Sequence, residues 1–371
     1  MQQLRKTSCL ISLAGIRRNI RKMRSLLPNN AALMLIVKAD AYGHGLTQMS
    51  FLAEQEGIEC LGVAIAEEGI TIREAGVRLP VLIFGALNQA GMDAAAVHDL
   101  IVTLPSIQSI EMAKLAAQRA GKPLQAHFKL ETGMNRIGIH SQDDLLLALD
   151  LLRTAHDVHI CGAFTHFADA NNSSSYYTDE QIRRFEVFSA MLPQDILLHA
   201  AATGGIIFKP EASFNMVRAG IGIYGYPPKN SPVDFGPCMT LTAEVSFVKT
   251  IQAGESVGYG CTFTAQRPMK IATLAIGYGD GYSRLMSNRG RVLIAGVSCP
   301  ITGLVCMDQM MVDASGVDYL EPGDEAVLIG GQGDEFIGAD EVADICGTIP
   351  YEVLLSIGAR VPRIYLDADE E

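Results

Sequence analysis

The sequence lacks the long apolar stretches that mark exported and membrane-spanning proteins. It contains no run of 18 uninterrupted apolar residues, and its N-terminus has no apolar segment long enough for a signal peptide. Its eight cysteines are scattered, without a Cys-x-x-Cys pair or the spacing of metal ligands. We therefore expect a cytoplasmic protein with reduced thiols in its core, rather than a secreted, disulfide-linked or zinc-binding protein.

Clustered positive charge and clustered metal ligands are also missing. The 29 Lys and Arg residues are outnumbered by 41 Asp and Glu residues, which gives a net charge of −12 without any basic patch in the sequence. This balance argues against nucleic acid or an anionic membrane surface as a partner. No group of His, Asp and Glu residues at ligand spacing is evident, so we expect no metal site.

Strand-like and helical patterns alternate through the first two thirds of the chain. Short apolar runs occur eight times, at 33–37, 60–64, 81–84, 100–104, 126–130, 159–164, 196–200 and 217–224. Helical patterns occur at 13–27 behind Ser12, at 46–56, 107–120 and 143–154, and at 179–191 behind a Thr178–Gln181 capping box. This alternation predicts a parallel (β/α)8 TIM-like barrel, and a doubly wound open sheet is the alternative.

The pattern changes after residue 224. Pro227-Pro-Lys-Asn-Ser-Pro232 has the composition of a linker, and strand-like runs follow it at 243–251, 270–276, 291–295, 301–305 and 325–329. A chain of 371 residues also exceeds what one hydrophobic core usually organises. We expect residues 1–230 to form the barrel and residues 231–371 to form a smaller, mainly β domain.

Lys38 is the most informative single residue. The five apolar residues Leu33–Val37 predict a buried strand, so Lys38 stands where that strand leaves the core. An amine at the rim of an apolar element loses hydration, which lowers its pKa and makes it a better nucleophile. An isolated lysine in this position would more often extend its amine into water, but Gly43 and Gly45 nearby let the backbone turn tightly and approach a ligand.

Other polar residues follow later strands of the predicted barrel. Arg136 comes after the fifth strand, His166 after the sixth and Thr203-Gly-Gly205 after the seventh, while Arg218 and Gly220 lie within the eighth. Active sites of such barrels form at the carboxyl ends of the strands. These residues are therefore expected to meet Lys38 at one rim.

The nine residues Val37-Lys-Ala-Asp-Ala-Tyr-Gly-His-Gly45 resemble the pyridoxal-phosphate lysine motif of the alanine racemases. Val217-Arg-Ala-Gly-Ile221, Ile276-Gly-Tyr-Gly-Asp-Gly-Tyr282 and Arg360-Val-Pro-Arg-Ile364 are similar to other motifs of that family. The resemblance implies a pyridoxal 5'-phosphate-dependent isomerase that interconverts L-alanine and D-alanine and supplies D-alanine for peptidoglycan. It also implies a homodimer whose active sites are shared between subunits.

The resemblance further implies two bases, because racemisation needs an acid/base group on each face of the substrate α-carbon. These are Lys38 and Tyr259. His166 and Arg136 form the network behind the tyrosine, and Arg218 pairs with the pyridine nitrogen of the cofactor. An arginine cannot give up a proton to that nitrogen, which favours proton return over transamination.

The remaining roles also come from the resemblance. Arg136 and Met307 bind the substrate, and Lys129, often carbamylated in the family, and Asp308 support them. Tyr351 narrows the entrance, which favours alanine. The residues expected to bind the cofactor are Lys38, Tyr42, His166, Thr203, Arg218, Gly220, Ile221 and Tyr351.

Three departures from the family pattern bear on the substrate. Thr203 ends an Ala-Ala-Thr segment where Ala-Asn-Ser is common, Asn135 replaces a usual glycine, and Leu304 replaces a common arginine. A serine or broad-specificity amino-acid racemase on the same scaffold is therefore an alternative. A non-catalytic pyridoxal-phosphate-binding protein and a metal-dependent barrel hydrolase are alternatives of other classes.

Overall fold

The computed structural model describes residues 5–28 and 31–367, which form two compact units. The barrel unit contains residues 17–41 and 45–235, and the β-rich unit contains residues 5–16, 42–44 and 236–367. Among the described residues, no helix combines the length and the apolarity needed to cross a membrane.

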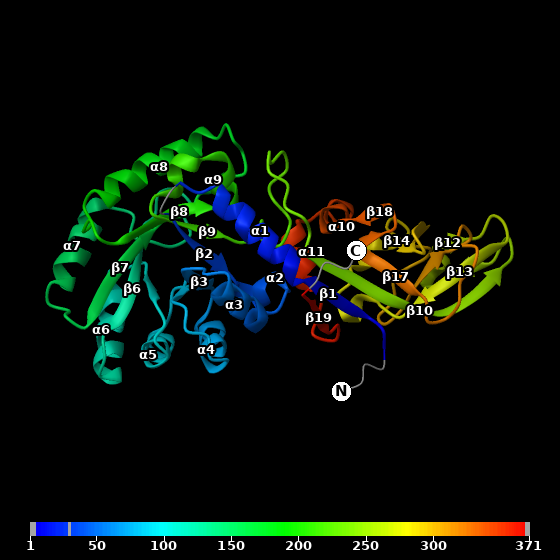
Figure 1. The fold of residues 1–371 in the computed structure, drawn as a ribbon, viewed down its shortest axis with the longest axis horizontal. Coiled ribbons are helices and arrows are strands. Elements are labelled where there is room, and N and C mark those ends of the chain that lie inside the picture. Colours follow the sequence, from blue (N-terminus) through cyan, green and yellow to red (C-terminus); the bar gives the residue numbers. More distant parts are fainter. Residues whose placement is uncertain (1–4, 29–30, 368–371) are drawn as a thin grey trace. The chain divides into compact units, whose positions relative to one another are not determined.

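The barrel unit is built on one parallel sheet (Figure 1). Its strands are hydrogen-bonded in the order β4-β3-β2-β9-β8-β7-β6-β5, and a parallel bridge between Leu82 and Ile101 joins the two ends. This bridge confirms the barrel and excludes the open sheet. The strands are β2 (Ala32–Ile36), β3 (Cys60–Val63), β4 (Val81–Ile83), β5 (Val102–Leu104), β6 (Leu124–Lys129), β7 (Val158–Phe164), β8 (Leu197–Ala202) and β9 (Met216–Ala219).

Helices follow the strands and lie outside them (Figure 1). They are α1 (Leu13–Ser25), α3 (Leu46–Gln55), α4 (Ala66–Glu74), α5 (Gln89–Val97), α6 (Ile107–Ala120), α7 (Gln142–Leu152), α8 (Tyr176–Ser189) and α9 (Thr203–Phe208), with a short turn η1 (Pro210–Ser213). The predicted capping box at Thr178 is wrong. Helix α8 begins three residues earlier, because the side chain of Ser175 accepts the N–H of Thr178 and caps the helix there.

The β-rich unit contains a nine-stranded sheet with the main order β15-β14-β17-β10-β1-β19. Its strands are β1 (Ser8–Ser12), β10 (Met239–Ile251), β13 (Met269–Leu274), β14 (Arg291–Ile294), β15 (Val297–Pro300), β16 (Met310–Asp313), β17 (Glu325–Gln332), β18 (Glu335–Ile337) and β19 (Arg363–Leu366). The unit also has a small hairpin, two helices and three short turns: β11 (Ser256–Val257), β12 (Phe263–Thr264), α10 (Ala339–Cys346), α11 (Pro350–Ser356), η2 (Tyr259–Cys261), η3 (Tyr278–Asp280) and η4 (Arg284–Met286).

Two features of this sheet differ from the sequence-based expectations. Strand β1 pairs with β10 and β19, so residues 8–12 belong to the β-rich unit although they precede the barrel in the chain. The strand expected at 301–305 is not formed beyond a single bridge between Ile301 and Val312. Gly303 turns the chain there with φ of +81°, and β16 provides the pairing strand instead.

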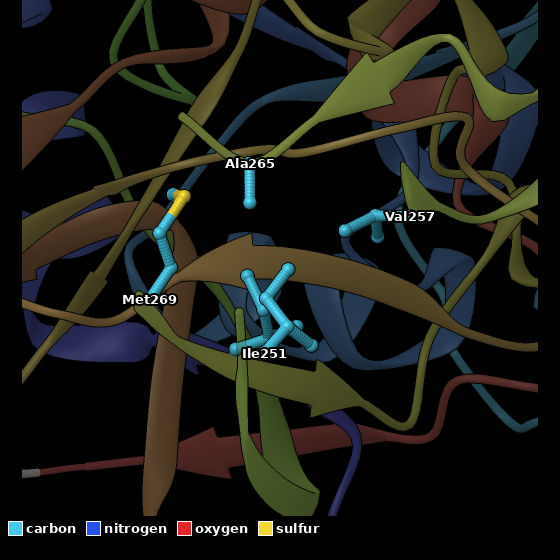
Figure 2. Close-up of a cluster of buried hydrophobic side chains, with 5 residues drawn as sticks. Ile251, Val257, Ala265 and Met269 are labelled. Atoms are coloured by element: carbon cyan, nitrogen blue, oxygen red, sulfur yellow. The ribbon is translucent and has the colours of Figure 1, made fainter. Parts of the chain in front are cut away.

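A compact apolar cluster supports the β11–β12 hairpin. Ile251, Val257, Ala265, Met269 and Ile271 are buried together, as Figure 2 shows for the labelled members. A hairpin with two residues in each strand is marginal by itself in water, so this packing is what fixes it. The hairpin matters because Tyr259 lies at its tip.

Candidate active site

Lys38 follows β2 and opens a segment of unusual backbone, α2 (Lys38–Tyr42). Ala39, Asp40, Ala41 and Tyr42 all have φ between 52° and 55°, which is the left-handed region. Left-handed geometry costs roughly 1–2 kcal/mol for each non-glycine residue, and such strain concentrates at functional sites. The sequence motif marked this place but did not predict its handedness.

Two carboxylates hold the left-handed turn by accepting backbone N–H groups. The side chain of Asp40 accepts the N–H of Leu46 at 2.7 Å, which ties the turn to the start of α3. Glu68 accepts the N–H of Ala39 at 2.5 Å and the N–H of Ala64 at 2.8 Å. Glu68 thus links the lysine turn to the end of β3.

The environment of Lys38 shifts its amine towards the neutral form. Burial lowers the pKa of Lys38, the nearby charges of Arg136 and Arg218 lower it further, and Glu68 opposes them. A neutral amine can act as a nucleophile or base, whereas an ammonium group cannot.

Arg218 on β9 is buried and surrounded by acceptors. Its guanidinium donates to the carbonyl oxygens of Thr165, His199 and Ala200 at 2.7–2.9 Å, and it contacts Nδ1 of His199 at 2.9 Å and Nδ1 of His166 at 3.1 Å. Burial lowers the pKa of Arg218, but these five contacts keep the group protonated at neutral pH. It forms no ion pair with a carboxylate of the described residues.

The arginine fixes the tautomers of a histidine chain. Because Arg218 only donates, Nδ1 of His199 and Nδ1 of His166 must accept, which leaves their protons on Nε2. Nε2 of His199 lies 2.9 Å from Nδ1 of His127, whose own Nε2 finds no partner among the described residues. Burial, followed by the charge of Arg218, lowers the pKa of each of the three imidazoles, so all three are neutral.

Lys129, at the end of β6, is a buried amine beside a cation. Its Nζ donates to the carbonyl of Leu130 at 2.7 Å and lies 5.8 Å from the centre of the Phe164 ring. Burial lowers the pKa of Lys129 to about 8. Glu131 opposes this effect, and the charges of Arg218 and Arg136 lower the pKa further. Glu131 also accepts the N–H of Arg136 at 3.3 Å, so it shapes the loop that carries this arginine.

Thr203 and Gly220 lie together at the ends of β8 and β9. The hydroxyl of Thr203 accepts the N–H groups of Gly220 and Gly222, each at 3.4 Å. A Cβ added to Gly222 would lie 2.6 Å from the methyl group of Thr203, and one added to Gly204 would lie 2.3 Å from the side chain of Asn171. The N–H groups of Gly204 and Ile221 donate to no described residue, which suits an anion.

The other predicted residues lie in the β-rich unit. Tyr259 is 73% exposed between Gly258 and Gly260, which have φ near +70°, and Met307 is 54% exposed. The rings of Tyr42 and Tyr351 are 5.7 Å apart, and burial raises the pKa of both phenols. Tyr259 thus presents a phenol, and Met307 a thioether, at the surface of this unit.

Sequence reasoning missed Glu68, His127 and His199. A signal existed for His127, since it lies two residues before Lys129 on the same strand and therefore on the same face. Glu68 gave no comparable signal, because an acidic residue in the first turn of a helix is ordinary.

Residues 11–228 match the family described as "Alanine racemase, N-terminal domain", and residues 238–365 match "Alanine racemase, C-terminal domain". The chain belongs to the alanine racemase family. Proteins named alanine racemase from Symbiobacterium thermophilum and Methanococcus maripaludis are 39% and 35% identical to it, over 98% and 96% of this chain and 97% of each relative.

Solved structures of the alanine racemase family agree in fold. The alanine racemase of Clostridium difficile 630 matches with a TM-score of 0.94 and 31% identity, covering 99% of this chain and 97% of that one. The alanine racemase from E. faecalis matches with a TM-score of 0.92 and 32% identity over 98% of both chains. The barrel followed by a mainly β domain is therefore the architecture of this family.

Proposed function

We propose that this chain racemises alanine with pyridoxal 5'-phosphate, using Lys38 and Tyr259 as its two bases. The observation that carries the proposal is made at the barrel rim. There the pKa of the Lys38 amine is lowered in part by the charge of buried Arg218, which pairs with no carboxylate among the described residues. The family relationship supplies the reaction, since the relatives compared above are named alanine racemases.

The residues of the barrel unit fit this cofactor. Thr203, Gly220 and Ile221 would bind its phosphate, because Thr203 and Gly220 meet at the ends of β8 and β9 and the nearby N–H groups of Gly204 and Ile221 donate to no described residue. Arg218 would meet the ring nitrogen and Lys38 the aldehyde carbon. We assign Tyr42, His166 and Tyr351 to the same group on the family resemblance.

When bound, pyridoxal phosphate withdraws electrons from the α-carbon of the amino acid and makes its proton removable. Arg218 limits this effect, because a guanidinium cannot transfer a proton to the ring nitrogen. His166 and His199 accept hydrogen bonds from Arg218 and hold it in place. Because both imidazoles are neutral, they add no acidic group beside the arginine. This arrangement favours return of the proton to the same carbon.

The two bases would act from opposite faces of the α-carbon. Nζ of Lys38 takes or gives the proton on one face, and the phenolic oxygen of Tyr259 does so on the other. Arg136 and Met307 would bind the substrate carboxylate, with Asp308 supporting Met307. A small side chain suits the entrance narrowed by Tyr351, so alanine is preferred to serine or larger amino acids.

Lys129 fits a carbamate better than a free ammonium. The neutral amine of a lysine with a pKa of about 8 can attack dissolved carbon dioxide, forming an N–C bond and releasing a proton to solvent. The product is an anion next to the charge of Arg136, whereas an unmodified ammonium repels it. We propose that the carbamate orients Arg136.

The assembly and the cellular role are part of the same proposal. Exposed Tyr259 and Met307 suit residues that serve the active site of a second subunit, so we propose a homodimer with shared sites. We further propose a cytoplasmic enzyme that supplies D-alanine for peptidoglycan.

Two variants test the proposed function. Lys38→Ala should lose the visible absorption band of the bound cofactor together with activity. Tyr259→Phe should keep the band but slow proton abstraction from one alanine enantiomer far more than from the other, measured by exchange of the α-proton in deuterated water. Equal slowing for both enantiomers would contradict the assignment of faces.

Substrate comparison and cofactor analysis separate the alternatives. Faster turnover of serine or lysine than of alanine would favour a broader racemase, and a bound cofactor without any racemisation would favour a non-catalytic carrier. No group of three or more potential metal ligands is found among the described side chains, and metal analysis of the purified protein tests the hydrolase alternative.

A further inference from the structure

The turn Cys306–Gln309, which carries Met307, packs closely against Gly277–Gly279 at the start of η3. The N–H groups of Tyr278 and Gly279 donate to the carbonyl oxygens of Cys306 and Met307 at 3.0 and 2.8 Å. A Cβ on Gly277 would lie 2.2 Å from the carbonyl oxygen of Cys306. Only a glycine permits this approach, so the position of the turn depends on this segment.

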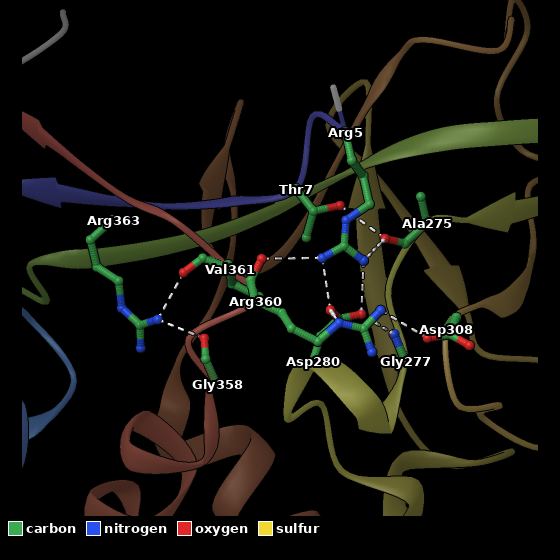
Figure 3. A network of polar contacts seen from close by, with 10 residues as sticks. All are labelled: Arg5, Thr7, Ala275, Gly277, Asp280, Asp308, Gly358, Arg360, Val361 and Arg363. Atoms are coloured by element: carbon green, nitrogen blue, oxygen red, sulfur yellow. Dashed lines mark hydrogen bonds and ion pairs between the residues drawn. The ribbon is translucent and has the colours of Figure 1, made fainter. Parts of the chain in front are cut away.

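Asp280 holds the segment Gly277–Gly279 in place. Its carboxylate is fully buried and accepts both Nη atoms of Arg5, at 2.7 and 3.0 Å, and the N–H of Gly277 at 3.1 Å (Figure 3). Nε of Arg360 lies 3.4 Å from the same carboxylate. A buried carboxylate with several donors is held firmly, because moving it would leave a charge without partners.

Arg360 connects this anchor to the turn itself. Its Nη2 donates to Asp308 at 2.9 Å, so one guanidinium bridges the buried and the exposed aspartate (Figure 3). Two arginines thus face two aspartates, and the charges balance. The backbone N–H groups of Met307 and Asp308 donate to no described residue, which leaves them available to an acceptor.

We infer that Arg360, Asp280 and Arg5 are positioning residues that aim the free N–H groups of Met307 and Asp308 at the substrate carboxylate. This inference rests on the proposed function. An arginine suits position 360 because its planar fork can bind two carboxylates in fixed directions, which a lysine cannot do. The three residues touch no reacting atom, so they should affect substrate binding rather than proton transfer.

A double-mutant cycle tests the bridge. Arg360→Met and Asp308→Asn should each raise the KM for alanine by about tenfold, while kcat stays within about twofold, because a carboxylate contact is loosened. The double variant should be no worse than the single ones, since both remove the same contact. Arg267→Met is the matched control, because its ion pair with Asp313 lies elsewhere in the unit, and it should leave the KM unchanged.

Binding of propionate gives a second readout that does not depend on turnover. Propionate offers a carboxylate without an amine, and calorimetry should show its affinity for the cofactor-loaded enzyme falling in Arg360→Met in parallel with the KM. Unchanged KM and propionate affinity in Arg360→Met, with a normal cofactor band, would overturn the inference and leave the proposed function intact. If Arg360→Met does not fold, Asp308→Asn, at an exposed position, decides the question by the same two measurements. A parent enzyme that binds the cofactor but does not racemise alanine would instead refute the proposed function.

Discussion

Burial of Lys129 costs folding free energy, and carbamylation of its amine would remove that cost. Lys129 is 1% exposed, and among the described residues its amine donates to the carbonyl of Leu130. Burial of an ammonium group without an anion destabilises the folded state. A carbamate would convert this unfavourable cation into an anion that can pair with Arg136.

The first prediction concerns Lys129→Met in buffer free of carbon dioxide. Folding lowers the pKa of this base from 10.5 to about 8, so the unfolded chain binds more protons between these values. The unfolding free energy of the parent therefore rises with pH across that range, and the cost is fully present below pH 8. At pH 7 the variant should be more stable by roughly 2 kcal/mol, after the lost hydrogen bond is allowed for.

Thermal unfolding at several pH values measures this difference, which should shrink as the pH rises towards 10.5 and then reverse, because the variant still lacks the hydrogen bond to Leu130. Added bicarbonate should then stabilise the parent and leave Lys129→Met unchanged, because a ligand that binds only the folded state shifts the equilibrium towards it. The same stabilisation in both proteins would show that Lys129 is not the reacting amine.

Helix α8 is the element that holds the loop carrying Arg136. Gln181, fully buried on this helix, donates to the hydroxyl of Thr132 at 3.3 Å and to the carbonyl of His166 at 3.1 Å, and its oxygen accepts the N–H of Ala168 at 2.8 Å. One side chain thus ties the loop after β6 to the segment after β7. Arg136 and His166 are placed by the same helix.

Gln181→Glu should therefore harm both stability and substrate binding. At pH 8 the new carboxylate would face the carbonyl oxygen of His166, which can only accept, and this should cost about 1–3 kcal/mol and raise the KM for alanine. Protonation of this buried carboxylate at lower pH restores a donor, so the stability loss relative to the parent should shrink at pH 5. Thermal unfolding and kinetics at both pH values test this, with exposed Arg183→Gln on the same helix as the control. A loss that is independent of pH would contradict the hydrogen-bond argument.

At the scale of elements, the sequence predicted the barrel strands well. It did not predict the pairing of β1 with β19 or the left-handed turn after Lys38. Parallel strands buried on both faces leave continuous apolar runs, which is why residues 33–37 and 60–64 mark β2 and β3. The pairing of β1 with β19 depends on contacts more than 300 residues apart, which local patterns do not record. The left-handed turn after Lys38 is maintained by Glu68 and Asp40, so it could not be read from Ala39 or Ala41.

Motif similarity identified the candidate site residues but not the buried side chains that hold them in place. Lys38, Arg136, His166 and Arg218 were expected together at one rim, and the structure brings Arg218 within 3.1 Å of His166. The histidine chain behind Arg218 was not predicted, because neutral buried histidines look like ordinary core residues in a sequence.

The β-rich unit exposes large apolar side chains that a monomer would leave in water. They include Tyr259, Tyr278, Leu285, Met307 and Ile349, each more than 40% exposed. At the scale of the whole molecule, the proposed homodimer would cover these side chains and bring Tyr259 of one subunit to Lys38 of the other.

Mixing two inactive variants decides between a shared and a single-chain site. A dimer of one Lys38→Ala chain and one Tyr259→Phe chain would contain one site with both native bases and one site with neither. After dissociation and random reassembly of equal amounts, about a quarter of all sites should recover native chemistry, since half of the dimers are hybrids. Racemisation of alanine, assayed against each variant reassembled alone, measures the recovery. A mixture no more active than its components, with hybrids present by native mass spectrometry, would mean that both bases act within one chain.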